Sequence, residues 1–372
     1  MKTRRKVSTT ALYGGIAGIA AARTAPVYAQ GVRIRKRGVS LDEAQEVHDT
    51  CLIIDGHNDR PVETIARGER KLDWHRIDSA YNIDIPRLKE GGFDAGSFIV
   101  GNGKVANIWV TTEIMLEEIE SHPETFIHVR TSQDILSARE NGKIGILMGV
   151  ESIGHWSEGK IDIVRHLYRT GVRLMGIIYM QGTSSSMAAC TPAEREEYRR
   201  TASGLIPFGF EVLKEVNRLG IVPDLSHIND TAFFEVMEHS TRPAIVSHTA
   251  VFTLCNNYRG LTDEQIKALA ETGGAMGITF VPRYIDADPA KATIDRVAEH
   301  VCYVADLAGI DYVGIGSDFD GIGSTVPVVP DPSKLVHLTR SMMEHGLSAE
   351  EIRKVWGGNF LRVIRASIDH PS

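Results

Sequence analysis

Cysteine is scarce in this sequence of 372 residues, with only Cys51, Cys190, Cys255 and Cys302 present. No two of them form a Cys-x-x-Cys pair, so nothing indicates a zinc knuckle or a thiol redox motif. In a domain of this size, four scattered cysteines are compatible both with buried thiols and with disulfides. They therefore carry no functional prediction.

Segments typical of disordered or multidomain chains are missing as well. After the first forty residues there is no Pro/Ser-rich linker, internal repeat or low-complexity tract. The 42% hydrophobic and 24% charged residues are typical of a globular protein. Because α/β barrels of more than about 250 residues commonly form one domain, we expect a single domain over residues 30–372.

The first 29 residues differ from the rest. Basic residues within positions 2–6 precede a weakly apolar run over residues 11–22, and a small-residue cleavage signal ends at Ala29. This pattern predicts a signal peptide over residues 1–29. The Arg4-Arg5 pair and Arg23 favour the twin-arginine export route over a general secretory signal or a retained anchor.

An excess of positive charge is also absent. Cleavage after Ala29 would remove five basic and no acidic residues, which moves the formal net charge from -7 to -12. This charge disfavours a nucleic-acid partner. The run over residues 11–22 is short for a bilayer span, and no apolar tail follows Ile368. We therefore expect an exported, periplasmic or secreted protein without a stable membrane anchor.

Eight continuous apolar runs are spaced along the rest of the chain. Parallel strands that are buried on both faces have this pattern, and a crossover must join each strand to the next. The runs are residues 51–59, 93–100, 144–151, 172–180, 221–227, 244–249, 274–281 and 312–320.

Between the runs, apolar residues recur with the spacing of a helix. The clearest cases are residues 114–119, 208–219, 230–239, 262–271 and 296–308. Thr262, which precedes two acidic residues, predicts a helix start, and Gly220 predicts a helix end. Strands that alternate with helices eight times predict a (β/α)8 barrel, with a doubly wound open sheet as the competing architecture.

Polar residues end six of the runs, where a barrel enzyme assembles its active site. They are His57 and Asp59, Glu151, Tyr179, His227, His248 and Asp318. His57 and Asp59 lie two positions apart on an extended chain, so both side chains can reach one cation. Glu151 follows a buried run, where a carboxylate needs a cationic partner, and its two oxygens can bridge two cations.

Three histidines and two carboxylates suit zinc. Each of them taken singly has a plainer interpretation, such as turn residues, an ion pair with a barrel arginine or a satisfied core histidine. Five side chains are too many for one tetrahedral catalytic zinc with a water position. With Glu151 as the bridge they suit two ions roughly 3.5 to 4 Å apart, so we predict two Zn²⁺ per chain.

Motifs around these residues resemble, in order, those of the membrane dipeptidase family of zinc peptidases. The motifs are Ile54-Asp55-Gly56-His57-Asn58-Asp59, Gly149-Val150-Glu151, Asp224-Leu225-Ser226-His227, Ser247-His248, and residues 316–321 and 357–363. The similarity covers about residues 42–367. It implies a metal-dependent dipeptidase on a (β/α)8 barrel and, because animal relatives form dimers, a homodimer.

The resemblance also implies roles for single residues. One zinc would be held by His57, Asp59 and Glu151, and the second by Glu151, His227 and His248. Arg259 falls where the family binds the substrate carboxylate. Asp318 falls where the family places the residue that handles the substrate amine and the proton.

One position departs from the family pattern. The best-known members have a histidine at the end of the fourth strand that helps bind the substrate carbonyl or the tetrahedral intermediate, and this chain has Tyr179 there. A phenol can donate a hydrogen bond to an oxyanion but cannot become cationic near neutral pH. We expect metal binding to be unaffected, while substrate choice and turnover depend on Tyr179 and on the differing segment 181–200.

The predicted reaction is hydrolysis of a dipeptide amide bond by a hydroxide that bridges two zinc ions. Asp318 would act as general base and then acid, and Arg259 would clamp the C-terminal carboxylate of the substrate. Two other functions stay open. One is hydrolysis of another amide or lactam, such as an N-acyl amino acid or a β-lactam, and the other is a non-catalytic periplasmic relative that binds a peptide-containing metabolite.

Overall fold

All eight predicted strands are present in the computed structural model, which describes residues 38–102, 107–157, 159–177, 204–323 and 325–370. They are β1 (Ile53–Asn58), β2 (Phe93–Gly101), β4 (Ile144–Val150), β5 (Val172–Gly176), β6 (Val222–Asp224), β7 (Ile245–Val251), β9 (Ala275–Ile278) and β10 (Val313–Ile315). Every residue of these strands is buried except Asp94, as expected for strands covered on both faces.

The strands form a (β/α)8 barrel. They pair in parallel in the order β1-β2-β4-β5-β6-β7-β9-β10. The ring closes where Asn58 bridges Phe319, with hydrogen bonds from Asp318 N to His57 O at 3.0 Å and from Asp59 N to Phe319 O at 2.8 Å. The alternative of a doubly wound open sheet is therefore wrong. Two short strands that the sequence did not predict, β3 (Phe126–His128) and β8 (Gly260–Leu261), pair with β4 and β7.

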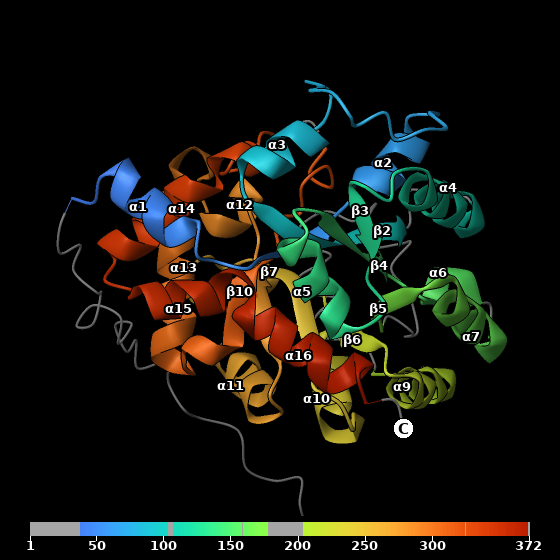
Figure 1. Cartoon of the computed structure of the whole chain (residues 1–372). Coiled ribbons are helices and arrows are strands. Elements are labelled where there is room, and N and C mark those ends of the chain that lie inside the picture. Colours follow the sequence, from blue (N-terminus) through green and yellow to red (C-terminus); the bar gives the residue numbers. More distant parts are fainter. Residues whose placement is uncertain (1–37, 103–106, 158, 178–203, 324, 371–372) are drawn as a thin grey trace, which may run out of the picture. The chain divides into compact units, whose positions relative to one another are not determined.

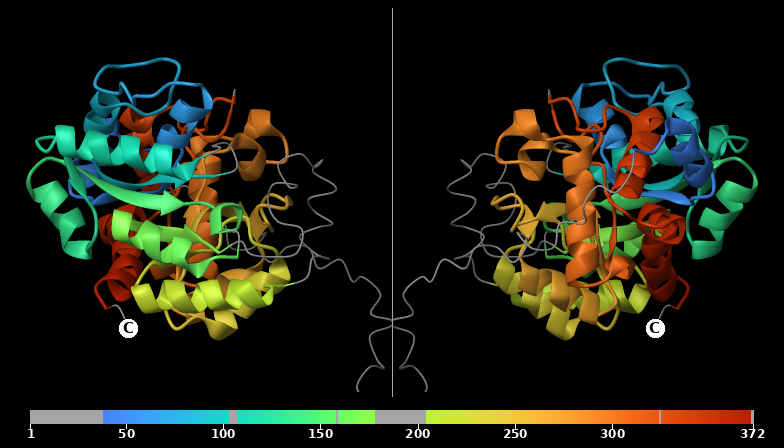
Figure 2. Two further views of the ribbon diagram at one scale, coloured as in Figure 1. Left: turned by 90° about the vertical axis from the view of Figure 1, so that its right-hand side faces the viewer. Right: turned by 90° about the vertical axis from the view of Figure 1, so that its left-hand side faces the viewer.

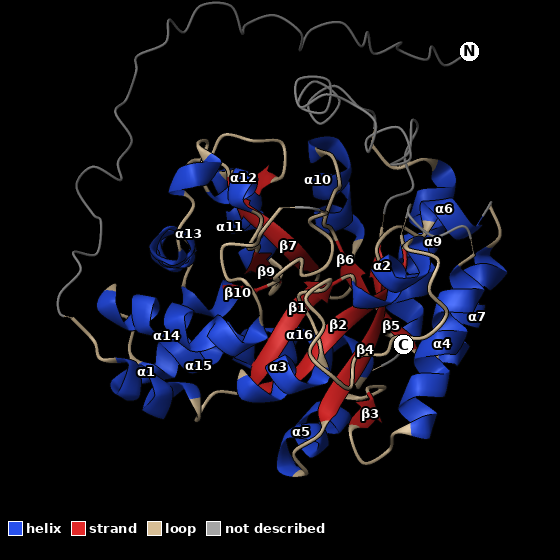
Figure 3. Cartoon of the chain, turned by 90° about the horizontal axis from the view of Figure 1, so that it is seen from above, coloured by secondary structure: helices blue, strands red, loops and turns tan. Residues whose placement is uncertain are grey.

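Helices surround the strands (Figures 1, 2 and 3). They are α1 (Leu41–His48), α2 (Arg60–Ala66), α3 (Ile85–Glu90), α4 (Ile108–Ser121), α5 (Ser132–Glu140), α6 (Gly154–Ser157), α7 (Ile161–Thr170), α9 (Pro207–Leu219), α10 (Asp230–His239), α11 (Asp263–Glu271), α12 (Pro282–Ile285), α13 (Ile294–Leu307), α14 (Leu335–Glu344), α15 (Ala349–Arg353) and α16 (Asn359–Ile368). All five helices predicted from the spacing are present. None of the helices within the described part of the chain is long and apolar enough to cross a membrane.

The predicted helix signals act as expected. The Thr262 side chain accepts a hydrogen bond from the Gln265 backbone at the start of α11, and the Gln265 side chain bonds back to Thr262, which completes a capping box. Gly220 ends α9 with φ at 75°, a left-handed conformation that glycine adopts without strain.

Helix α16 fills one end of the barrel. Its Phe360 and Ile364 belong to a buried cluster with residues of several strands, among them Leu147, Val222 and Ile245. A Cβ atom on Gly56 would lie 2.7 Å from the Phe360 ring and 2.5 Å from the Ser247 carbonyl oxygen, so only glycine fits beside α16 at this position. The polar strand ends lie at the other end, which leaves that mouth for chemistry.

Some predictions fall on residues outside the described ranges. These are the signal peptide over residues 1–29, Tyr179 and the segment 181–200, and Cys190. Cys51, Cys255 and Cys302 are buried free thiols, which is one of the two states that the sequence left open for them.

Candidate metal centre

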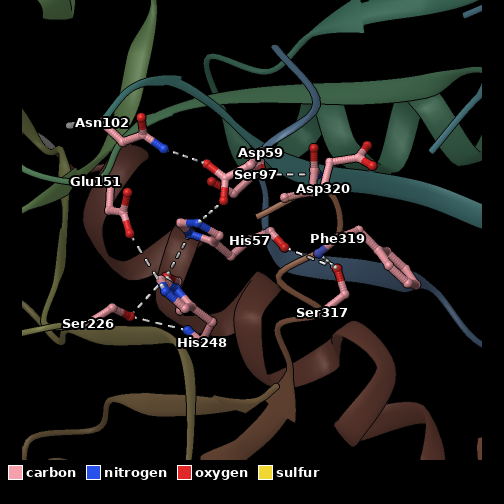
Figure 4. Close-up of polar contacts among 12 residues, drawn as sticks. His57, Asp59, Ser97, Asn102, Glu151, Ser226, His248, Ser317, Phe319 and Asp320 are labelled. Atoms are coloured by element: carbon pink, nitrogen blue, oxygen red, sulfur yellow. Dashed lines mark hydrogen bonds and ion pairs between the residues drawn. The ribbon is translucent and has the colours of Figure 1, made fainter. Parts of the chain in front are cut away.

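His57 and Asp59 end β1 as a pair of buried side chains. His57 Nε2 lies 3.5 Å from Asp59 Oδ2, and the two side chains are 0% and 4% exposed. Asn102, which follows β2, donates a hydrogen bond of 2.9 Å to the other carboxylate oxygen of Asp59. Asp59 is therefore held between Asn102 and His57, with one carboxylate oxygen toward each (Figure 4).

Glu151, His227 and His248 come together from β4, β6 and β7. Glu151 Oε1 lies 2.6 Å from His227 Nε2 and 3.8 Å from His248 Nε2, and these two nitrogens are 3.0 Å apart. His227 has φ at 66°, a conformation that is uncommon outside glycine and that turns its side chain back into the mouth.

The two sets of side chains meet. Ligand atoms of His57, Glu151 and His248 all lie within 4.8 Å of one another, and so do those of His57, Asp59 and Asp318. The structure thus brings together all five residues predicted as metal ligands, with Asp318 beside them. Glu151 is the carboxylate near both sets, which is the position that the predicted bridging role requires.

The donor atoms fit a divalent cation. His57 Nε2 is buried and has no hydrogen-bond partner among the described residues, although it faces carboxylates. A buried polar atom of this kind needs a partner, and a cation would supply it. Gly321 keeps room beside the carboxylates, because a Cβ there would lie 2.2 Å from Asp59 Oδ2 and 2.3 Å from Asp318 Oδ1.

Electrostatics at the mouth also favour a cation. Burial alone would lower the pKa of His57, but the contact with Asp59 and the negative charges around it raise this pKa to about 9. Burial alone would raise the pKa of Glu151, but His227 and His57 lower it well below its ordinary value. Burial also lowers the pKa of His248, with further contributions from the positive charges nearby. The negative charge around His57 therefore favours a positive charge at this position, which a divalent cation can supply.

A hydrogen-bond network anchored on Asp224 fixes the orientation of two imidazoles. Ser247 Oγ donates to Asp224 Oδ2 at 2.6 Å and lies 3.0 Å from His248 Nδ1 and 3.3 Å from His57 Nδ1. Because the single proton of this hydroxyl goes to Asp224, both Nδ1 atoms must donate to Ser247. That leaves the Nε2 lone pairs free for a metal, the arrangement in which outer partners set the tautomer of a ligand.

Ser226 completes this network. Its hydroxyl donates to Asp224 Oδ1 at 2.9 Å, lies 3.0 Å from Ser247 Oγ and accepts a hydrogen bond from the His248 backbone at 3.2 Å. The sequence showed a serine before each of His227 and His248 but did not predict what these serines do. The repeated Ser-His pair was the signal that could have identified them.

Replacing Asp224 with asparagine tests this network. Asparagine cannot accept from both serines in the same way, so the imidazoles should lose their fixed tautomer, and zinc affinity should fall about 10- to 100-fold. Competition of the purified variants against a zinc chelator measures the effect. Asp94→Asn is the matched control. Asp224 accepts a hydrogen bond from the backbone N–H of Ser247 in β7, and Asp94 accepts one from that of Ile53 in β1, away from the five ligands. Equal losses of affinity in both variants would contradict the assigned role.

Asp318 lies beside the five ligands on the closing edge of the barrel. It has φ at 62°, and its backbone donates to His57 O. Ser317 before it is anchored by hydrogen bonds of 2.8 and 2.6 Å from its N–H and hydroxyl to Asp55. Burial raises the pKa of Asp318 to about 7, against the opposing effect of His57. A carboxyl group with such a pKa can accept and release a proton near neutral pH.

Arg259 is a buried guanidinium beside the histidines. It is 7% exposed and donates through Nη2 to His248 O at 3.0 Å. Its Nε and Nη1 atoms have no hydrogen-bond partner among the described residues. Its charge also contributes to the lowered pKa of Glu151, after the larger effects of His227 and His57. Two free donors on one planar group suit a carboxylate.

Comparisons with known proteins identify the family of this chain. A model of the membrane dipeptidase family (peptidase family M19) matches residues 41–370. Dipeptidase tcpJ from Claviceps purpurea (strain 20.1) is 28% identical over 329 residues, which cover 84% of this chain and 76% of the relative.

Two solved structures have the same fold. An amidohydrolase from Pseudomonas aeruginosa has 25% sequence identity and a TM-score of 0.73, over 88% of this chain and 99% of that chain. A metallopeptidase from Rhodobacter sphaeroides, bound to a phosphinate mimic of the dipeptide L-Ala-D-Ala, has 23% identity and a TM-score of 0.73, over 85% of this chain and 99% of that chain. The second likeness concerns the fold alone.

Proposed function

Because the chain belongs to the membrane dipeptidase family, peptidase family M19, we propose that it hydrolyses the amide bond of dipeptides. One observation carries the proposal: five side chains with metal-binding atoms converge at the mouth of the barrel. Next to them lie the Asp318 carboxyl group and the Arg259 guanidinium, two of whose nitrogens have no partner among the described residues. A metal centre, a proton carrier and an anchor for a carboxylate are the three parts that such a reaction needs.

The metal that suits these side chains best is zinc, two ions per chain. Imidazole and carboxylate donors together favour zinc over magnesium or calcium, which prefer oxygen donors alone. His57, Asp59 and Glu151 would hold one ion, and Glu151, His227 and His248 the other. When bound, such ions supply a hydroxide nucleophile near neutral pH and polarise the carbonyl of the scissile amide.

Asp318 would move the proton of the reaction. Its carboxyl group lies within 4.8 Å of His57 and Asp59 ligand atoms, so it can accept the proton of the attacking water and pass it to the departing nitrogen. The backbone contact with His57 and the Ser317–Asp55 hydrogen bonds keep it in place. Preorganisation of this kind spares the reaction a reorientation step.

Arg259 would anchor the C-terminal carboxylate of the dipeptide. Replacing it with alanine should raise KM for dipeptides on the order of 10- to 100-fold, because hydrogen bonds to charged groups are among the stronger ones. Initial rates with a dipeptide and with the same dipeptide amidated at its C-terminus measure the effect, which should be confined to the first substrate. Arg283→Ala, which removes a neighbouring arginine that donates to Tyr284, is the control. Equal losses on both substrates would exclude the anchor.

Release of amino acids from a dipeptide library by the zinc-loaded chain tests the function itself. The same assay should include N-acyl amino acids and a β-lactam. Hydrolysis of dipeptides is the expected result. Hydrolysis of the other amides alone would assign the chain to a different amidohydrolase activity, and no turnover with zinc bound would make it a non-catalytic binding protein.

We also propose that the enzyme is exported from the cytoplasm. The evidence is the sequence of residues 1–29, with its Arg4-Arg5 pair and Ala29 cleavage signal. N-terminal sequencing of the exported protein should therefore begin at Gln30. An N-terminus at Met1 in all cell fractions would contradict export.

A further inference from the structure

A second group of metal-binding side chains lies apart from the mouth of the barrel. It consists of His75, in the connection between α2 and α3, and of Glu118 and His122 at the end of α4. The ligand atoms of these three residues lie within 4.8 Å of one another. None of them takes part in the reaction proposed above.

Their spacing suits an ion of zinc's size. His75 Nε2 lies 2.7 Å from Glu118 Oε1, and His122 Nε2 lies 3.8 Å from the same oxygen. Four ligands around a tetrahedral zinc at about 2.1 Å are separated by about 3.4 Å, a value between these two distances. Small rotations of the side chains would therefore bring all three atoms to coordination distance.

Neighbouring side chains already orient the three candidate ligands. Trp74, which is fully buried, donates through Nε1 to Glu118 Oε1 at 2.9 Å, and its ring stacks on Phe126. This fixes both the carboxylate and the chain next to His75. His122 Nδ1 lies 3.4 Å from Glu124 Oε1, so a carboxylate faces the imidazole nitrogen opposite the shared centre. A carboxylate in this place is typical of histidine ligands and strengthens them.

The exposure of the group leaves one side open. The His75 and His122 side chains are 40% and 35% exposed, while Glu118 is 15% exposed. A water molecule can therefore complete the coordination of an ion without rearrangement of the backbone. Two imidazoles and one carboxylate favour zinc, copper or nickel over magnesium and calcium.

We propose that His75, Glu118 and His122 form a peripheral site for a divalent transition-metal ion. The ion would join the connection between α2 and α3 to the end of α4. The same connection contacts the mouth of the barrel, because Asn82 N donates to Asp320 Oδ1 at 2.5 Å and Asp320 N donates to the Asn82 side chain at 3.1 Å. The peripheral ion is therefore a structural clamp on a segment that borders the active site.

Counting ions in matched variants tests this site. Wild type and the His75→Gln/His122→Gln double variant are saturated with Zn²⁺, freed of loose ions by gel filtration and analysed by mass spectrometry of the metal. We expect one ion fewer per chain in the double variant. His239→Gln, which replaces a histidine on α10, is the control and should keep the wild-type number. Because only a difference between variants is read, the result does not depend on how many ions the central site holds.

A melting experiment separates the site from a folding defect. Titration with Zn²⁺ should raise Tm of the wild type and of His239→Gln in a second step, after the central site is filled, and the double variant should lack this step. Mg²⁺ should not produce it in any variant. Equal ion counts with equal zinc-dependent Tm shifts in all three proteins would overturn the proposal and leave the group as an ion-pair cluster. If the double variant has a lower Tm than the wild type without added zinc, the single variant His122→Gln takes its place. Its ion count and its zinc-dependent rise of Tm are then compared with those of the wild type.

Discussion

Replacing Asp318 with asparagine should lower kcat for dipeptides roughly 10²- to 10⁴-fold while the number of bound metal ions stays the same. Asparagine has nearly the same shape but cannot accept the proton of the attacking water. Asp318 lies next to His57 and Asp59, and burial raises its pKa to about 7, so it is the described carboxyl group best placed for proton transfer. Steady-state kinetics together with metal analysis of the same samples measure both quantities.

Asp320→Asn is the matched control for this experiment. Asp320 lies two residues further on, has a similar backbone conformation with φ at 63°, and burial raises its pKa to about 6. Its carboxylate, however, accepts hydrogen bonds from Asn82 and Ile83 backbone N–H groups, which an asparagine oxygen can also accept in part. The control should therefore lose much less activity. Full activity of Asp318→Asn with both ions bound would remove Asp318 from the mechanism.

Replacing Glu151 with glutamine should have the largest effect on metal binding. Glutamine keeps the length of the side chain but removes the negative charge that lies near His57 as well as near His227 and His248. Removal of partners outside the coordination shell already lowers metal affinity about 10- to 100-fold, so loss of a bridging ligand should lower it more than about 100-fold. Metal content after dialysis against buffered zinc, and residual dipeptide hydrolysis, measure the outcome.

Glu215→Gln serves as the control for Glu151. Glu215 is a buried carboxylate too, 7% exposed, but it pairs with Arg165 and Arg218 on the outside of the barrel. Its loss should change stability without changing metal content. If Glu151→Gln retained two tightly bound ions, Glu151 would not be the bridge, and the assignment of ligands would have to change.

Much of the barrel was predictable because its strands are buried on both faces. Continuous apolar runs such as residues 144–151 have no competing interpretation as exposed structure, and they correspond to strands at every predicted position. Placement of the ligands followed from the same pattern. A histidine or acidic residue directly after such a run has to lie at the carboxyl end of a strand, where the strands of a barrel meet.

The hydrogen-bond network behind the ligands could not be predicted in the same way. Ser247 contacts His57 across 190 positions of sequence, and this contact depends on how β1 and β7 face each other inside the closed barrel. The role of Asp224 depends on the register of β6 against β7, which pairs Asp224 with Ile245. The left-handed backbone of His227 and Asp318 is likewise a product of the turns that follow the strands.

The group of His75, Glu118 and His122 could not be predicted from the sequence either. Glu118 lies on α4 and His122 follows the last residue of this helix, four positions later, so helical spacing accounts for their proximity. His75, in contrast, comes from the connection in which Trp74 packs against Glu118. Nothing in the spacing of the sequence joins these three residues. Contacts between a connection and a helix become visible only when the fold is known.

Anomalous diffraction at the zinc edge from crystals of the zinc-loaded chain would show how many ions the five predicted ligands hold. We predict two peaks at the mouth of the barrel, roughly 3.5 to 4 Å apart, with Glu151 between them. His57 and Asp59 should complete one ion and His227 and His248 the other. A single peak at the mouth, or zinc bound away from these five side chains, would contradict the account.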